Sequence, residues 1–280
     1  MKHTFSVTIF LILLFMVSHL VGLFVIKNYL PEEKSLPLKI EKPQFEEKTA
    51  YIPIIITIII TTIFALILLK FRAMKIWKIW FFFSVFICLT ISFSAFMKEK
   101  IAIFISLILA LLKSFKPNII IHNLTEVFIY GGLASIFVPV LNLFSVIILL
   151  LAISIYDMIA VWKTKHMINL AKFQAESNVF AGLFIPYNKS VKTKTINENK
   201  PVKSESKQAV LGGGDIGFTL LFSGVIFKTF GFLPAIIVSF TTTIALLLLF
   251  LFADNKKFYP AMPFLTIGCL IGLGIVKLIF

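Results

Sequence analysis

Residues 209–227 read AVLGGGDIGFTLLFSGVIF, and this stretch decides the class of fold. It is long and apolar enough to cross a bilayer as one helix, which takes about 20 residues. The whole chain has a similar character, with 59% hydrophobic residues, 14% charged residues and a mean hydropathy of +1.00. Soluble domains contain about 45–50% apolar and about 25% charged residues. The sequence therefore predicts an integral membrane protein, part of whose surface is in contact with lipid.

The apolar runs on either side of this stretch predict an all-α integral membrane protein with nine transmembrane helices. The expected spans are 4–26, 52–69, 79–97, 101–115, 119–138, 140–162, 209–227, 233–253 and 261–280. The short run at 101–115 spans only if Lys113 extends toward the membrane surface. A polar, basic loop at 163–208 separates an N-terminal six-helix bundle (1–162) from a C-terminal three-helix part (209–280).

Charge predicts the orientation of the chain. Lysine and arginine total 27 against 13 acidic residues, and basic residues are enriched in cytoplasmic loops. With a cytoplasmic N-terminus, 18 basic residues fall inside and 9 outside. We therefore expect a multi-pass protein of the cell membrane, with the 163–208 loop in the cytoplasm and the C-terminus outside. The basic excess then faces anionic membrane lipid, and no nucleic-acid partner is expected.

Three acidic residues fall at membrane depth: Asp157, Asp215 and Glu126. A carboxylate at the centre of a span costs roughly 2.5–3.5 kcal/mol, so each needs a reason. Glu126 follows Asn123 by three residues, which predicts a capping box at a helix start, with a polar contact inside the bundle as the alternative. Asp157 and Asp215 are expected roughly 8 and 10 Å inside the membrane on antiparallel helices, and hence at one depth.

Two carboxylates within a few ångströms of each other cannot both stay ionised, so they share a proton. One can then activate a water while the other protonates a carbonyl oxygen, which is the chemistry of aspartic peptide hydrolysis. A pair of acids that relays protons in a transporter or channel is the alternative. The sequence contains no H-E-x-x-H motif, and we expect neither a metal nor a cofactor.

Three glycines precede the second acid, and two prolines lie far downstream, at the start of the last span. Gly212, Gly213 and Gly214 directly precede the second acid. They weaken a helix and let another backbone approach, as a protease that opens a helical substrate requires, although a helix-packing groove is the other interpretation. Pro260 and Pro263 stiffen the start of the last span, either as ordinary helix-start prolines or as a rigid loop against the acids.

Three motifs in this order resemble the presenilin and signal peptide peptidase family of intramembrane aspartyl proteases. Tyr156-Asp157 matches the family's YD motif, Gly212-x-Gly214-Asp215 matches GxGD, and Pro260-Ala261-Met262 is close to PAL. The resemblance implies a presenilin-like fold and a GxGD aspartic endopeptidase in which Asp157 and Asp215 are catalytic. Tyr156, the three glycines and Pro260-Ala261-Met262 would bind substrate or support the site. Met262 replaces the expected leucine, and Gly213 stands where the family has a bulkier residue.

The resemblance also implies partners. Substrates would be transmembrane helices or signal peptides of membrane proteins, cleaved within the membrane. The chain is similar in length to archaeal homologues, which implies no obligate partner subunit and leaves a homo-oligomer open. Its orientation resembles that of presenilins, which implies substrates with their N-termini outside. A type IV prepilin peptidase is a further alternative, but that family carries a lysine where this chain has Ile216-Gly217-Phe218. Within the basic loop, apolar Val179–Pro186 is expected to lie in the membrane interface or to cover the site.

Overall fold

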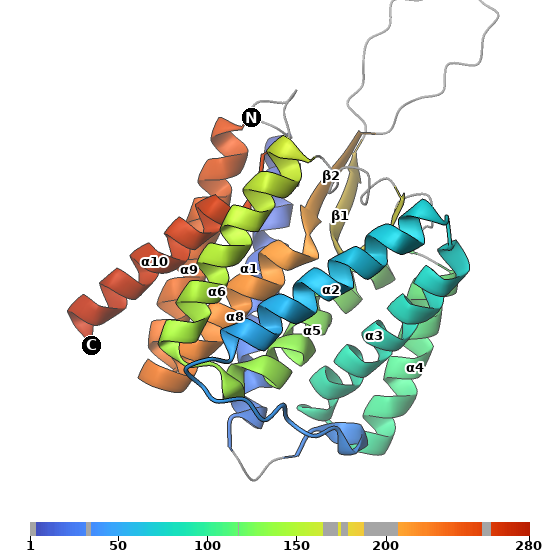
Figure 1. Cartoon of the computed structure of the whole chain (residues 1–280), viewed down its shortest axis with the longest axis horizontal. Coiled ribbons are helices and arrows are strands. Elements are labelled where there is room, and N and C mark those ends of the chain that lie inside the picture. Colours follow the sequence, from blue (N-terminus) through green and yellow to red (C-terminus); the bar gives the residue numbers. More distant parts are fainter. Residues whose placement is uncertain are drawn as a thin grey trace, which may run out of the picture.

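The computed structural model describes residues 4–31, 35–116, 118–164, 173–174, 179–187, 207–253 and 259–280. Within these residues the chain forms nine α-helices and one two-stranded sheet (Figure 1). The helices are α1 (Phe5–Tyr29), α2 (Tyr51–Lys70), α3 (Met74–Ser94), α4 (Glu99–Phe115), α5 (Ile119–Phe137), α6 (Leu143–Met158), α8 (Gly213–Phe230), α9 (Phe232–Phe252) and α10 (Met262–Ile279). Three short helical turns lie between these helices or at their ends: η1 (Pro37–Lys39), η2 (Val138–Val140) and the π-helical η3 (Ile159–Lys163). The two strands are β1 (Gly182–Tyr187) and β2 (Lys207–Gly212).

The central element is α8, which packs against α1, α5, α6, α9 and α10 (Figure 1). Its side chains from Thr219 to Ile226 are all buried, and a helix buried all round is covered by protein. By length and apolar composition, seven of the described helices could each span a membrane, and α4 and α8 are not among them. Because protein rather than lipid surrounds α8, this helix can hold an acid and several glycines inside an all-α membrane fold.

Several helix ends differ from the hydropathy pattern. The helix expected to start at residue 79 begins at Met74, so Lys75 and Lys78 lie on α3 and not in a loop. The helix expected from residue 140 begins at Leu143, because the side chain of Asn142 caps it by accepting a hydrogen bond from the Ser145 N–H at 2.8 Å. Hydropathy marks where lipid or core begins, whereas a helix ends where its hydrogen bonding ends, so the two boundaries differ by several residues.

A β-hairpin occupies part of the segment expected to be a polar loop. Strand β1 pairs antiparallel with β2, with Gly182 opposite Gly212 and Leu183 opposite Leu211. The expectation that a helix begins at residue 209 is therefore wrong, since residues 207–212 form β2 and α8 starts at Gly213. Apolar residues 182–186 belong to β1. The rest of the predicted loop, apart from residues 163–164, 173–174 and 179–181, lies outside the described residues.

The capping-box interpretation of Glu126 is wrong. Helix α5 begins a turn earlier, where the Asn118 side chain accepts a hydrogen bond from the Ile120 N–H at 2.8 Å. Glu126 lies inside the helix, and its Oε1 is 2.6 Å from the Nζ of Lys113 on α4. Lys113 thus points into the protein and not toward the membrane surface, and each side chain is only 1% exposed. The two charges compensate each other, which is how the short α4 carries a lysine.

The two ends of the chain lie at opposite ends of the bundle. Figure 1 shows the N-terminal end of α1 beside the end that carries the hairpin, and the C-terminal end of α10 at the other. An odd number of membrane crossings gives this arrangement.

Candidate active site

Asp157 lies near the end of α6, immediately before the π-helical turn. Its side chain is buried, and its Oδ2 accepts a hydrogen bond from the backbone N–H of Met262 at 3.2 Å. Met262 is the first residue of α10. The first turn of a helix offers N–H groups without a helical partner and a partial positive charge, both of which favour an anion. The surroundings of Asp157 therefore suit a carboxylate that is ionised during a reaction.

A second contact fixes α6 against α10 one turn away. The hydroxyls of Ser154 and Thr266 are hydrogen-bonded at 2.5 Å, and both side chains are buried. The bond joins the same two helices as the contact between Asp157 and Met262. Sequence reasoning missed this pair, although Ser154 lies three residues before Asp157 and hence on the same face of α6.

Asp215 lies in the first turn of α8 and is half-buried. Helices α6 and α8 pack against each other, and Asp215 interacts electrostatically with Asp157. Residues 209–212 are extended, so the helical rise used to place Asp215 does not apply to them. The two acids are nevertheless close enough to interact, because Asp215 lies in the first turn of α8, three residues after the end of β2, and α8 packs against α6.

A pocket opens beside Asp215. It is lined by Val210 and Leu211 of β2, by Leu249, Phe250 and Ala253 at the end of α9, and by Tyr259 and Ala261 before α10. Apart from the Asp215 carboxylate and the Tyr259 hydroxyl, these side chains are apolar. An apolar lining with few polar groups suits an apolar peptide segment.

The three glycines before Asp215 have different surroundings. A Cβ added to Gly212 would lie 3.2 Å from Oδ2 of Asp215. At Gly213 it would lie 2.7 Å from the hydroxyl of Tyr130 on α5, so this glycine allows close packing of two helices. At Gly214 it would meet only the Phe218 ring, at 3.7 Å, and the residue is exposed. Helix packing thus accounts for Gly213, whereas Gly212 and Gly214 leave space around the acid.

Polar side chains support Asp215 from inside the bundle. The hydroxyl of Thr219 donates to the Asp215 carbonyl oxygen at 2.6 Å, one helical turn away. The buried ring of His19 on α1 lies between Thr219 and Ser239, with nitrogen–oxygen distances of 3.0 and 3.1 Å. These contacts tie the first turn of α8 to α1 and α9. Sequence reasoning did not single out His19, whose position in the first span carries no motif.

The prolines and their neighbours lie where the last helix begins. Pro260 is buried, Ala261 is the N-cap of α10, and Pro263 lies in the first turn, where its missing N–H is not needed. Met262 contacts Asp157 through its backbone, while its side chain is buried in the core. A leucine would offer the same backbone N–H. Tyr156 is half-buried on α6.

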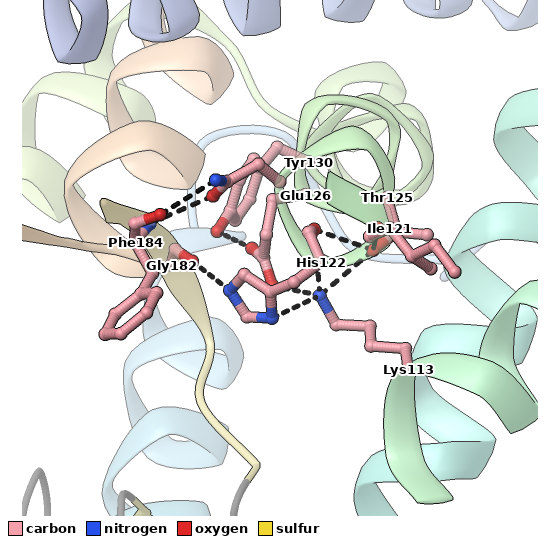
Figure 2. Close-up of polar contacts among 9 residues, drawn as sticks. Lys113, Ile121, His122, Thr125, Glu126, Tyr130, Gly182 and Phe184 are labelled. Carbon is pink, nitrogen blue, oxygen red and sulfur yellow. Dashed lines mark hydrogen bonds and ion pairs between the residues drawn. The ribbon is translucent and has the colours of Figure 1, made fainter. Parts of the chain in front are cut away.

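A buried polar cluster adjoins the glycines from α4 and α5 (Figure 2). The hydroxyl of Tyr130 donates to Oε2 of Glu126, whose other oxygen pairs with Lys113. Tyr130 is the residue that packs on Gly213. The cluster was missed because Lys113 and Glu126 were interpreted as residues near helix ends.

The sequence of the chain matches a family model described as signal-peptide peptidase, presenilin aspartyl protease, over residues 9–280. The chain belongs to this family. It is therefore an intramembrane aspartyl protease, an aspartic endopeptidase and a multi-pass membrane protein, and the family match favours this activity over the transporter and prepilin peptidase alternatives.

Two solved structures are similar to this family member over nearly the whole chain. One is of a presenilin family intramembrane aspartate protease in a C222 crystal form, with 18% identity and a TM-score of 0.64, covering 98% of this chain and 99% of the other. The second has the same description in a P2 crystal form, with 16% identity and a TM-score of 0.63, covering 96% and 97%. They show that the presenilin-like fold is shared. A comparison with curated protein sequences found no match.

Proposed function

We propose that Asp157 and Asp215 are the catalytic pair of this intramembrane protease. The observation that carries the proposal is the interaction of two carboxylates from adjacent helices, one of which, Asp215, lines a pocket. A buried acid without a counter-charge is costly in a membrane protein and marks a functional site. The ion pairs among the described residues join Lys113 to Glu126 and Lys228 to Glu47, and neither involves these two acids.

The pair hydrolyses the peptide bond by sharing one proton. The ionised carboxylate takes a proton from a water molecule, whose oxygen attacks the carbonyl carbon, while the protonated carboxyl gives its proton to the carbonyl oxygen. One hydroxyl of the resulting diol returns its proton to the second carboxylate, which is now ionised, as the C=O bond re-forms and the C–N bond breaks. The leaving nitrogen receives the proton that the first carboxylate had taken. The N–H of Met262 stabilises the charge on Asp157 when that carboxylate is ionised.

The remaining predicted site residues hold the pair and admit the substrate. Gly212 and Gly214 leave room for an extended substrate backbone at Asp215. Pro260 and Ala261 give the start of α10 a fixed shape, which keeps the Met262 N–H directed at Asp157. Gly213 packs against α5, where a bulkier residue would not fit. The glycine at this position therefore affects helix packing more than it affects which substrates are cleaved.

The chain places its N-terminus in the cytoplasm and its C-terminus outside, in the cell membrane. The distribution of 18 basic residues inside and 9 outside supports this orientation. The start of α1 and the end of α10 lie at opposite ends of the bundle (Figure 1), which fits termini on opposite sides of the membrane in either orientation. Substrates are single-span proteins with their N-termini outside, and the protein needs no partner subunit. Cleavage of only the reverse orientation in proteoliposomes would overturn the orientation.

The experiment is cleavage of a single-span reporter by the purified protein, beside the variants Asp157→Ala and Asp215→Ala. An aspartyl-protease transition-state analogue is added in a parallel reaction. We expect cleavage by the unaltered protein alone, and its loss with the analogue. Cleavage by either variant at the unaltered rate would refute the assignment of that residue.

A further inference from the structure

Helix α5 binds strand β1 through side chains that contact its backbone. The amide of Asn123 donates to the carbonyl oxygen of Phe184 at 2.8 Å and accepts from the N–H of the same residue at 3.0 Å. Nε2 of His122 is 2.7 Å from the carbonyl oxygen of Gly182. Since a carbonyl only accepts, this ring nitrogen carries the hydrogen. Asn123 thus takes the place of a neighbouring strand for β1, whose other edge pairs with β2.

Lys113, which is paired with Glu126, also contacts His122 (Figure 2). Nζ of Lys113 lies 3.4 Å from Nδ1 of His122 and 3.4 Å from its carbonyl oxygen, and 3.1 Å from the hydroxyl of Thr125. With Nδ1 accepting from Lys113, Nε2 is the nitrogen that donates to β1. The lysine therefore sets both the tautomer and the direction of the His122 ring.

The hairpin connects β1 to the backbone that leads to Asp215. Gly182 and Gly212 face each other in the sheet, and the N–H of Gly213 donates to the carbonyl oxygen of Ala181 at 3.2 Å. Gly182 has φ +139°, and a Cβ there would lie 2.2 Å from the carbonyl oxygen of Leu211, so no other residue fits this crossing. Asp215 lies three residues after Gly212. The backbone leading to the acid is thus held by β1, and β1 is held by α5.

We propose that Asn123 and His122 are positioning residues for this protease: they hold β1, and through it the segment from Gly212 to Asp215, in the geometry that hydrolysis requires. The inference rests on the proposed function of Asp215. Neither residue reaches the pocket lining, so they act through the hairpin and not on the substrate.

The test compares Asn123→Leu with Asn118→Leu in the full-length protein. Asn118 lies on the same helix and also uses its side chain to bond a backbone N–H, but it contacts Ile120 and not the hairpin. We expect Asn123→Leu to lower kcat for the reporter about tenfold or more, with KM changed less than threefold. Hydrogen exchange of the β1 and β2 amides should become faster. Asn118→Leu should leave kcat within about twofold and hairpin exchange unchanged.

His122→Phe gives an independent measurement if Asn123→Leu does not fold. Phenylalanine keeps the ring contacts with Phe180 and Phe184 but removes the hydrogen bond to Gly182. The proposal expects a lower kcat and faster hairpin exchange in this variant as well. A folded variant of either residue with an unaltered kcat would overturn it. Because these results are read against cleavage by the unaltered protein, failure of that protein to cleave would count against the proposed function instead.

Discussion

Two groups of acids lie inside the membrane part of this protein, and their surroundings differ. Glu126 has a cation at 2.6 Å, a tyrosine hydroxyl on its other oxygen and almost no exposure. Asp157 and Asp215 come from different helices and interact with each other, and Asp215 lines a pocket. A neutralised carboxylate in a closed site stabilises the fold, whereas two interacting carboxylates, one of them in a pocket, can transfer protons to and from a substrate.

The sequence alone does not distinguish a buried acid that stabilises the fold from one that takes part in the reaction. All three acids interrupt apolar runs. What distinguishes them is the partner that the fold supplies, a lysine from α4 in one case and the N–H at the start of α10 in the other. Variants of these acids and of their neighbours test this distinction.

Asp157→Asn and Asp215→Asn should each lower the rate of reporter cleavage by about 10³-fold or more. An amide keeps the shape of the side chain but cannot exchange the proton that the reaction needs. The melting temperature in detergent should not fall, because neither acid has a cationic partner among the described residues. A variant with substantial residual activity would place the acid outside the chemistry.

Glu126→Gln should destabilise the protein by about 3–5 kcal/mol, since it leaves the buried charge of Lys113 without compensation. Unfolding in detergent, followed by circular dichroism, measures the loss. The double variant Lys113→Met with Glu126→Met is the control, and it should recover most of the stability because both charges are removed. Equal stability of the single variant and the unaltered protein would contradict a structural ion pair.

Gly213→Ala should cost about 1–3 kcal/mol, because the new Cβ would lie 2.7 Å from a tyrosine hydroxyl that Glu126 holds in place. Gly214→Ala is the matched control, since its Cβ meets nothing closer than 3.7 Å. Thermal unfolding of the two variants compares them. The packing role of Gly213 would be refuted if both were equally stable.

Met262→Leu should have the smallest effect, with kcat within about twofold of the unaltered protein. Asp157 accepts from the backbone N–H at this position, and leucine offers the same donor with a side chain of similar volume. Steady-state cleavage of the reporter measures it. A loss of tenfold or more would show that the methionine side chain itself has a role.

Much of the fold could be predicted because it depends on hydropathy, which is a local property. The order of the helices and the break before Leu143 follow from apolar runs, an adjacent proline and a capping asparagine. The hairpin could not be predicted in this way. Its strands are short and lie within a segment whose average composition is basic, so the pairing of Gly182 with Gly212 left no compositional signal.

The candidate site likewise contains residues that the sequence predicts and contacts that it does not. Asp157 and Asp215 stand out because an acid in an apolar run is rare, and the motifs around them are contiguous in sequence. The contacts that hold the helices of the site together join distant residues, such as Ser154 and Thr266, which lie 112 residues apart and look like ordinary small polar residues on their helices. Lys113 was assigned to the membrane surface because its span was short, and only the position of α5 reveals its partner. The catalytic roles themselves stay predictions until they are tested by activity.

The most direct test measures cleavage and melting temperature together for Asp215→Asn and Glu126→Gln. We expect opposite outcomes: Asp215→Asn keeps its melting temperature and loses cleavage, whereas Glu126→Gln loses stability and, where still folded, cleaves the reporter. A cleaving Asp215→Asn, or a fully stable Glu126→Gln that does not cleave, would contradict the division between an acid pair for chemistry and an ion pair for the fold.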